Sequence, residues 1–275
     1  TRDLGGSELR FGIEVTQKDR DTDITTDRNR ITLPNAPAPS PPIPGTFGPF
    51  LPLDGGLNSI EETRVEPFVK LSGTSGALEW EAGLRYQQTD VEINDKTVAP
   101  ADARAENDYG VFLPSGHLRW NLDDSNRITA SVARTMRRPG FDQISPALLL
   151  AELGDNDLLG NPDLEPETAW GLDLGWERRL GSRGVIGINA FYRDITDLIE
   201  IANTGVEGDE GPGTFVLQPR NTGDGQVWGI ELDLSTPLTA FGSNSVPNNF
   251  YASRNRNGDK GWQYFVHDAE HTLLN

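Results

Sequence analysis

The chain of 275 residues has no cysteine, a deficit of basic residues and no long apolar run. Without cysteine it can form neither disulfides nor thiolate metal sites. Its 24 Lys and Arg against 42 Asp and Glu give a formal net charge of −18. That balance argues against nucleic acid as a partner, because phosphates need a basic surface. No stretch approaches the ~20 consecutive apolar residues of a transmembrane helix. A helical membrane protein is thereby excluded, whereas a membrane β-barrel is not, because only every second residue of its strands is apolar.

What the sequence does contain is period-two alternation of apolar and polar residues, which predicts β-strands. In the stretch 170–177, Trp170, Leu172, Leu174 and Trp176 alternate with Gly, Asp and Glu. Similar alternation predicts strands at 9–15, 78–87, 128–133 and 228–234, and less regular strands are expected at 64–71, 109–122, 185–201 and 214–220. No segment gives a convincing amphipathic helix.

The predicted strands are joined by connections whose lengths alternate. Short, turn-like connections lie at 72–76, 123–126 and 181–184. Long connections lie at 18–59, 91–106, 137–167 and 197–214, the first of which includes a proline-rich stretch that cannot pair in a sheet. An up-and-down antiparallel sheet would then have all its short turns at one edge and all its long loops at the other.

Aromatic residues mark the ends of the apolar faces. Trp170 and Trp176 lie six positions apart on one face, roughly 20 Å at ~3.3 Å per residue. Trp80 and Tyr86 repeat this spacing. Transmembrane barrels place an aromatic girdle at each boundary of an apolar band ~25 Å tall. The pattern therefore favours a transmembrane barrel, and a soluble β-sandwich is the alternative.

Three stretches carry a resemblance to a known family. They are SVARTMRRPGFDQISP (131–146), LGNPDLEPETAWGLDLGWERRL (159–180) and GVIGINAFYRDITDLIE (184–200). In order, they resemble the barrel of TonB-dependent outer-membrane receptors, with matching steps at Arg138-Pro139, Gly160-Asn161-Pro162, 164–167 and 191–193. The resemblance covers about residues 8–241.

The resemblance implies an all-β, up-and-down antiparallel transmembrane barrel with long extracellular loops, located in the outer membrane. It implies uptake of a scarce small-molecule ligand of the siderophore, cobalamin or oligosaccharide class. The implied partners are outer-membrane lipid, the ligand and the TonB energy-transducing complex, which acts through a plug domain. An enzymatic activity and a cofactor are not implied. A soluble surface β-protein that binds glycan or a partner is the second reading.

The chain departs from the family in extent. No plug domain, TonB-recognition segment or N-terminal signal peptide is recognisable in it. It offers about nine strands, whereas large receptors of this kind have about 22. We therefore expect 1–241 to be part of a barrel, with an open edge that leaves backbone groups unsatisfied in lipid.

The C-terminal tail, residues 242–275, reads differently. From 243 to 275 it resembles a fragment of a CotH kinase-like protein, which suggests a foreign or mis-joined segment and gives a third functional reading. HDAEH at 267–271 also matches the H-x-x-E-H form, with His267 and His271 as zinc ligands and Glu270 as base. The kinase-like reading would use Asp268 or Glu270. These residues are explained more simply as the solvent-exposed, acidic end of a strand, so no catalytic, cofactor or metal residue is predicted.

The candidate ligand-binding residues lie where a strand meets the longest loop. Arg134, Arg137 and Arg138 cluster there, and guanidinium groups bind anions well. Contact with lipopolysaccharide or with loop carboxylates would also explain them. The loop 137–167 is the chief candidate ligand surface, and the lone histidine His117 is expected to face the lumen.

Overall fold

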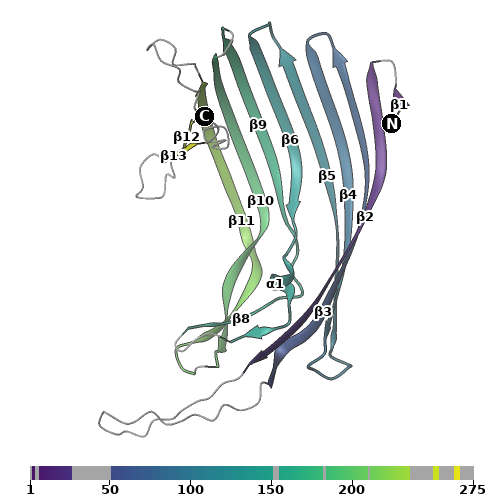
Figure 1. Ribbon diagram of the computed structural model, residues 1–275, viewed down its shortest axis with the longest axis vertical. Helices are drawn as coiled ribbons and strands as arrows, with labels where there is room; N and C mark the ends of the chain where they lie inside the picture. The colour runs from purple at the N-terminus through teal and green to yellow at the C-terminus, as the bar shows by residue number, and fades with distance from the viewer. Residues whose placement is uncertain are drawn as a thin grey trace, which may run out of the picture.

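The computed structural model describes residues 6–26, 51–150, 155–181, 184–209 and 211–235, and the backbone of 2–3, 250–253 and 263–266. Most of these residues form one sheet of 11 strands (Figure 1). Its strands are β1 (Arg2–Asp3), β2 (Ser7–Thr26), β3 (Leu51–Ser75), β4 (Leu78–Asp95), β5 (Arg104–Asn121), β6 (Asn126–Arg137), β7 (Leu148–Leu149), β8 (Asp157–Leu159), β9 (Glu167–Leu180), β10 (Gly184–Glu207) and β11 (Phe215–Ser235). A single helical turn, α1 (Phe141–Ile144), follows β6, and β12 (Phe250–Ser253) pairs with β13 (Gln263–Val266) in a separate sheet.

The eight long strands pair in the order β2-β3-β4-β5-β6-β9-β10-β11, each antiparallel to its neighbour. The tight connections β3–β4, β5–β6 and β9–β10 all lie at one end of the sheet, here called the short-turn end. Gly76 turns the first of them with a φ of 61°, which suits a residue without a Cβ. The other connections lie at the opposite, long-loop end. The predicted up-and-down fold is therefore confirmed, and within the described residues β2 and β11 do not pair, so the barrel is incomplete.

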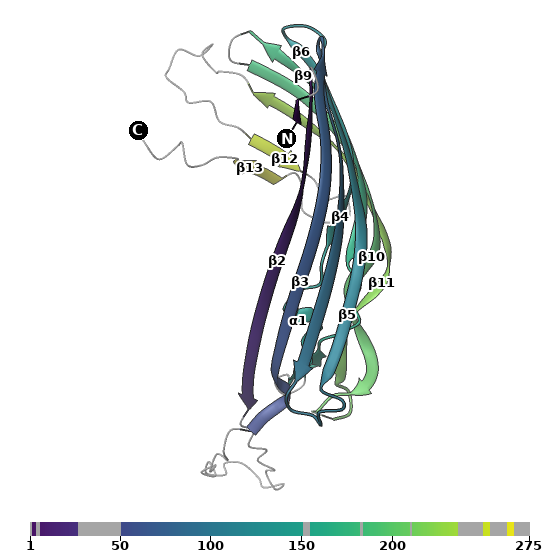
Figure 2. The ribbon, with the colours of Figure 1, turned by 90° about the vertical axis from the view of Figure 1, so that its right-hand side faces the viewer.

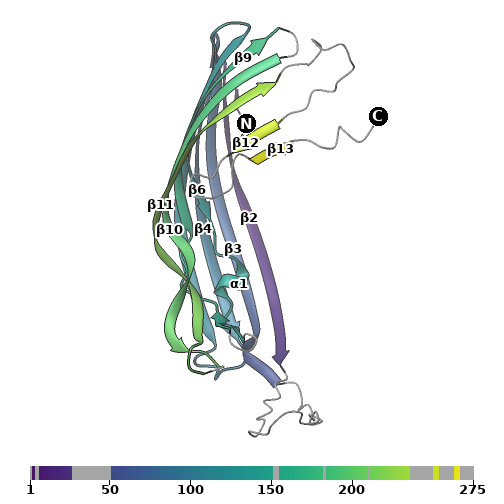
Figure 3. The same ribbon diagram turned by 90° about the vertical axis from the view of Figure 1, so that its left-hand side faces the viewer.

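The sheet is curved along and across its strands (Figures 2 and 3). Helix α1 lies inside the curve, so the face it packs against is the concave face. The convex face is apolar over its central rows, where Leu172 and Leu174 are 53% and 56% exposed. Other exposed apolar side chains on this face are Phe11, Ile13, Val69, Leu84, Leu118, Val132, Ile188, Ile230 and Leu232. Such a band is suited to lipid rather than water.

Aromatic residues bound this band. Trp176 pairs with Ile128, which pairs with Trp120, so both tryptophans lie in one row toward the short-turn end. Trp170 lies six residues along β9 on the long-loop side, where the tilted rings of Tyr86 and Phe112 are in contact with their centres 4.7 Å apart. The convex face thus carries aromatic residues on both sides of its apolar rows, as the spacing predicted. Among the described residues, no helix is long and apolar enough to cross a membrane.

The strands extend further toward the long-loop end than the sequence predicted. Strand β2 continues to Thr26 and β10 to Glu207, through segments expected to be loops. Beyond the apolar band, both faces of a strand are in polar surroundings. Apolar and polar residues therefore no longer alternate there, although the backbone hydrogen bonds between the strands continue. The segments 214–220 and 228–234, expected as two strands, form the single strand β11.

The described residues of the connection from β6 to β9, 138–150 and 155–166, fold into the concave face and are called the inward loop below (Figure 3). Its Ile144 and Leu164 form an apolar cluster with Ile60, Val91 and Ile93 of the sheet. Leu164 and Ile60 are completely buried. Burial of apolar surface contributes about 25 cal/mol per Å². The cluster therefore stabilises the loop against the concave face of the sheet.

Close backbone packing and hydrogen bonds hold the inward loop on its other side. A Cβ at Gly160 would overlap the carbonyl oxygen of Ser145, so only glycine fits there. The side-chain amide of Gln218, on β11, donates to the Gly160 carbonyl oxygen at 3.0 Å. Asn161 donates to the carbonyl oxygen of Pro219 at 3.1 Å. The loop therefore bridges the β3–β5 side and the β10–β11 side of the sheet.

The predictions for the tail fall mostly outside the described residues. That holds for the motif 267–271 with its two histidines. The boundary at 241 and the foreign or mis-joined origin of 242–275 stay predictions.

Candidate functional site

The three predicted ligand-binding arginines occupy different environments. Arg134 pairs with Trp170 across the β6–β9 ladder, and its Nη2 donates to the Thr168 hydroxyl at 3.3 Å. The Nε of Arg137 lies 2.9 Å from a carboxylate oxygen of Glu167. Arg138 follows the end of β6, is half-buried, and has no hydrogen bond or ion pair with any described residue. Of the three, Arg137 is paired with a carboxylate, whereas Arg134 and Arg138 have no carboxylate partner among the described residues.

Arg138 lines a first hollow, called the outer hollow, of about 590 Å³ between β2, β3 and the start of the inward loop. Four cations line it: Lys18, Arg20, Arg137 and Arg138. Two acids, Glu62 and Asp142, also line it, and Asp142 accepts a bond of 2.8 Å from Arg20. The described residues of the lining therefore carry two more positive than negative charges.

Arg138 also lines a second hollow, called the middle hollow, of about 390 Å³ on the concave face nearer the short-turn end. Among the described residues, its lining has the cations Lys70, Arg85, Arg134 and Arg138 and no acid. Two of these cations are already paired with carboxylates next to the hollow, Lys70 with Glu81 and Arg85 with Glu14 and Glu66. Arg134 is among the residues that line it, although its strand register pairs it with Trp170 on the convex face. The Arg85 guanidinium lies 5.2 Å from the centre of the Phe68 ring, within cation–π range.

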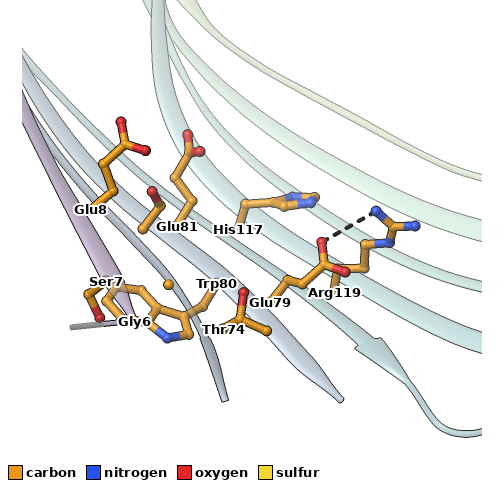
Figure 4. A pocket seen from close by; sticks show the side chains of 11 residues that line it. Gly6, Ser7, Glu8, Thr74, Glu79, Trp80, Glu81, His117 and Arg119 are labelled. Carbon is orange, nitrogen blue, oxygen red and sulfur yellow. Dashed lines mark hydrogen bonds and ion pairs between the residues drawn. The ribbon is translucent and has the colours of Figure 1, made fainter. Parts of the chain in front are cut away.

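A third hollow, called the acidic hollow, lies near the short-turn end and measures about 560 Å³ (Figure 4). Glu8, Glu79 and Glu81 line it together with His117 and Arg119. Glu79 and Arg119 form an ion pair at 3.4 Å, drawn as a dashed line. The prediction that His117 faces the lumen is confirmed, because it projects into this hollow on the concave face.

Sequence reasoning missed most of the cations in these hollows. Lys18, Arg20, Lys70 and Arg85 come from β2, β3 and β4 and are far from the arginine cluster in the chain. Strand alternation places each on the polar face, but only the pairing register brings them to the same end of the lumen. Within the described part of the chain, no group of three or more His, Asp or Glu residues could hold a metal ion.

A family model described as TonB dependent receptor-like, beta-barrel, matches residues 3–269. The chain belongs to this family. The resemblance read from the three stretches is confirmed, as is the outer-membrane location. The family comprises transport receptors rather than enzymes, in agreement with the prediction.

Two relatives and two solved structures illustrate the match. The iron-regulated outer membrane virulence protein of Vibrio cholerae is 30% identical over 139 residues, which cover 49% of this chain and 21% of the relative. The ferric enterobactin receptor PirA of Pseudomonas aeruginosa is 28% identical over 166 residues, 56% of this chain and 22% of the relative. The chain therefore aligns with about a fifth of the length of these relatives.

The structural likeness supports the fold alone, since the identities are low. The copper transporter OprC superposes with a TM-score of 0.61 at 15% identity, covering 86% of this chain and 34% of OprC. The FrpB iron transporter of Neisseria meningitidis superposes with a TM-score of 0.58 at 14% identity, covering 97% of this chain and 34% of that protein.

Proposed function

We propose that the chain is part of an outer-membrane receptor that takes up a scarce, anionic ferric siderophore with energy transmitted by TonB. The relatives are named as an iron-regulated outer-membrane protein and a ferric enterobactin receptor. TonB would act through a plug domain in the whole receptor. The cobalamin and oligosaccharide classes named by the resemblance are the competing ligands.

The observation that carries this proposal is the sign of the charges around Arg138. The whole chain has a formal net charge of −18, yet the described residues that line the outer hollow include four cations and two acids. A local reversal of charge in a cleft raises the concentration of ions of the opposite sign and speeds their capture. An anionic ligand therefore fits this hollow better than a neutral oligosaccharide.

The predicted arginines take unequal parts in the proposal. Arg138 has no carboxylate partner within the part of the chain that the structure describes, and it is the proposed main contact. Arg137 lines the same hollow while paired with Glu167, so it contributes long-range attraction. Arg134 contacts the hydroxyl of Thr168 and pairs with Trp170 across the ladder, so its proposed part is smaller than that of Arg138.

The test is uptake of radiolabelled iron as ferric enterobactin by iron-starved cells that express the whole receptor. Arg138→Gln should lower uptake about tenfold at limiting ligand, because charge-assisted hydrogen bonds are among the strongest single contacts. The control is Arg178→Gln, which removes a charge from an exposed residue of β9 near the short-turn end. Uptake in the control should match the unaltered receptor.

Two results would contradict the proposal. If uptake persists in cells that lack TonB, then TonB does not supply the energy for it. If the receptor instead takes up a neutral oligosaccharide and ignores the ferric complex, the ligand class is wrong and Arg138 has another role.

A further inference from the structure

We infer that Arg134 is the centre of a docking site for lipopolysaccharide, the anionic lipid of the outer leaflet, and binds a phosphate of its lipid A. The site lies on the convex face, where the apolar band ends on the long-loop side. This side faces the outer leaflet, because barrels of this kind have their long loops outside the cell. The inference goes beyond the proposed function, since it concerns the surface toward the membrane and not the lumen.

The level of Arg134 along its strand is the first argument. Arg134 pairs with Trp170, and the next pair toward the short-turn end on the same face is Val132 with Leu172. Val132 and Leu172 are exposed apolar residues of the band, and Trp170 is 48% exposed at its boundary. Arg134 therefore stands in the row where apolar side chains give way to polar ones. In a transmembrane barrel, this row meets the headgroups of the lipid.

The direction and charge of the Arg134 guanidinium are the second argument. Its Nη2 donates to the hydroxyl of Thr168, which lies nearer the long-loop end of β9. The Thr168 hydroxyl is itself 2.8 Å from that of Thr196. The arginine thus reaches from the edge of the band toward the headgroups, as long cationic side chains do at membrane boundaries. No carboxylate pairs with it among the described residues, so its remaining N–H groups are available to a phosphate.

Aromatic side chains near Arg134 supply contact for the acyl chains that continue from the phosphates into the bilayer. Trp170 stands opposite it on β9, and Phe112 of the neighbouring strand β5 is 57% exposed on the same face. Phe112 in turn contacts Tyr86. Aromatic rings are favoured where apolar chains meet polar groups. A cation just beyond such rings therefore fits a lipid that has apolar tails and an anionic head.

The charges on the adjoining part of the convex face are the third argument, because they would repel a phosphate. Beyond the apolar band, strands β4 and β5 place four acids on this face: Asp90, Glu92, Glu106 and Asp108. Arg104 lies among them but is held by ion pairs to Glu92 and Glu106. Like charges repel and opposite charges attract over several ångströms. The anionic headgroup is therefore directed away from β4 and β5 and toward Arg134 on β6.

The test measures the affinity of the whole, purified receptor for lipid A by native mass spectrometry in detergent. Arg134→Gln should lower the affinity for bisphosphorylated lipid A about tenfold, because a charge-assisted hydrogen bond to a phosphate is lost. Arg134→Lys keeps the charge without the planar fork of donors, so its loss should be smaller, about threefold. The matched control is Arg104→Gln, which removes a cation of the same face that is already held by two acids. Its affinity should equal that of the unaltered receptor.

Two further lipids identify the group that is bound. Lipid A without phosphates should bind the unaltered receptor about as weakly as bisphosphorylated lipid A binds Arg134→Gln, and phosphatidylglycerol should bind more weakly than lipid A. Equal affinity of the unaltered receptor and both Arg134 variants for bisphosphorylated lipid A would overturn the inference. An equal loss in Arg104→Gln would show a general effect of charge and would also overturn it. Phosphatidylglycerol that binds as tightly as lipid A would overturn lipopolysaccharide as the occupant.

Discussion

The side-chain amide of Asn107, on β5, donates a hydrogen bond to the carbonyl oxygen of Leu164 over 2.9 Å. The same amide donates to the carbonyl oxygen of Pro162 over 2.8 Å. Leu164 is completely buried, so its carbonyl has little access to water, and a buried carbonyl needs a partner. One amide therefore satisfies two carbonyls of an irregular segment and fixes the inward loop beside the hollows.

Replacing Asn107 by aspartate should loosen the inward loop. The substitution keeps the shape of the side chain. It replaces the amide nitrogen that donates both hydrogen bonds by a carboxylate oxygen, which faces the two carbonyl oxygens. Two lost hydrogen bonds cost about 2 kcal/mol locally, which corresponds to about a 30-fold faster hydrogen exchange. The measurement is exchange followed by mass spectrometry on peptides that cover 156–166.

Asn94→Asp is the control, because Asn94 is an exposed residue of β4. Its exchange pattern in 156–166 should be unchanged. Equal protection in both variants would mean that the apolar cluster alone holds the loop.

The apolar band on the convex face predicts a strong cost for charge at its centre. Leu174→Arg should destabilise the folded receptor in lipid by about 2–4 kcal/mol, the range for arginine facing the bilayer midplane. Thr129→Arg is the control, since Thr129 pairs with Gly175 on the concave face. The measurement is the urea midpoint of unfolding from lipid vesicles. Equal midpoints for both variants would argue against lipid contact at Leu174.

A row of four acids crosses the convex face beyond the apolar band. Asp19, Glu61, Glu92 and Glu106 are consecutive cross-strand partners, and like charges directly opposite each other are destabilising. Arg104 offsets part of this repulsion through ion pairs of 2.8 Å to Glu92 and 2.6 Å to Glu106.

Arg104→Gln should therefore destabilise the long-loop end by about 1 kcal/mol at low salt, an amount limited by the exposure of these groups. High salt should remove most of the difference. Adding Glu92→Gln to the same chain removes one acid of the row and should restore stability. Protease sensitivity of the β4–β5 connection measures both effects, and no rescue by the second substitution would argue that Arg104 acts by packing.

Sequence patterns predicted the strands that have one solvent-facing and one lipid-facing side. They did not predict the parts of the fold in which both sides are polar. Trp170 to Trp176 alternate strictly because β9 crosses the apolar band there. Residues 18–26 were expected to be loop because both faces of β2 are polar, so periodicity cannot reveal a strand. Arg138 was found because it stands beside other arginines in the chain. Lys70 and Arg85 were missed because their positions beside β6 depend on the pairing register of strands β3 to β6. That register is a property of the folded sheet.

The turn between β5 and β6 gives a prediction about pH. The Asp123 carboxylate accepts backbone hydrogen bonds from Ser125 at 2.7 Å and from Asn126 at 2.8 Å, and Asn126 also donates from its side chain. These bonds, the one from the Ser125 amide foremost, lower the pKa of Asp123 below its usual value of 3.8. The folded state therefore favours the ionised form.

A lowered pKa means that the stabilisation is present above the unfolded value and is lost as pH falls through the folded one. We expect the β5–β6 turn to keep its protection against hydrogen exchange, corrected for intrinsic rates, at about pH 5 and to lose part of it below about pH 3. Asp123→Asn has no charge to lose, so its protection should be lower at the higher pH and vary less between the two. If the variant keeps the full pH dependence of the unaltered chain, another carboxylate governs the turn.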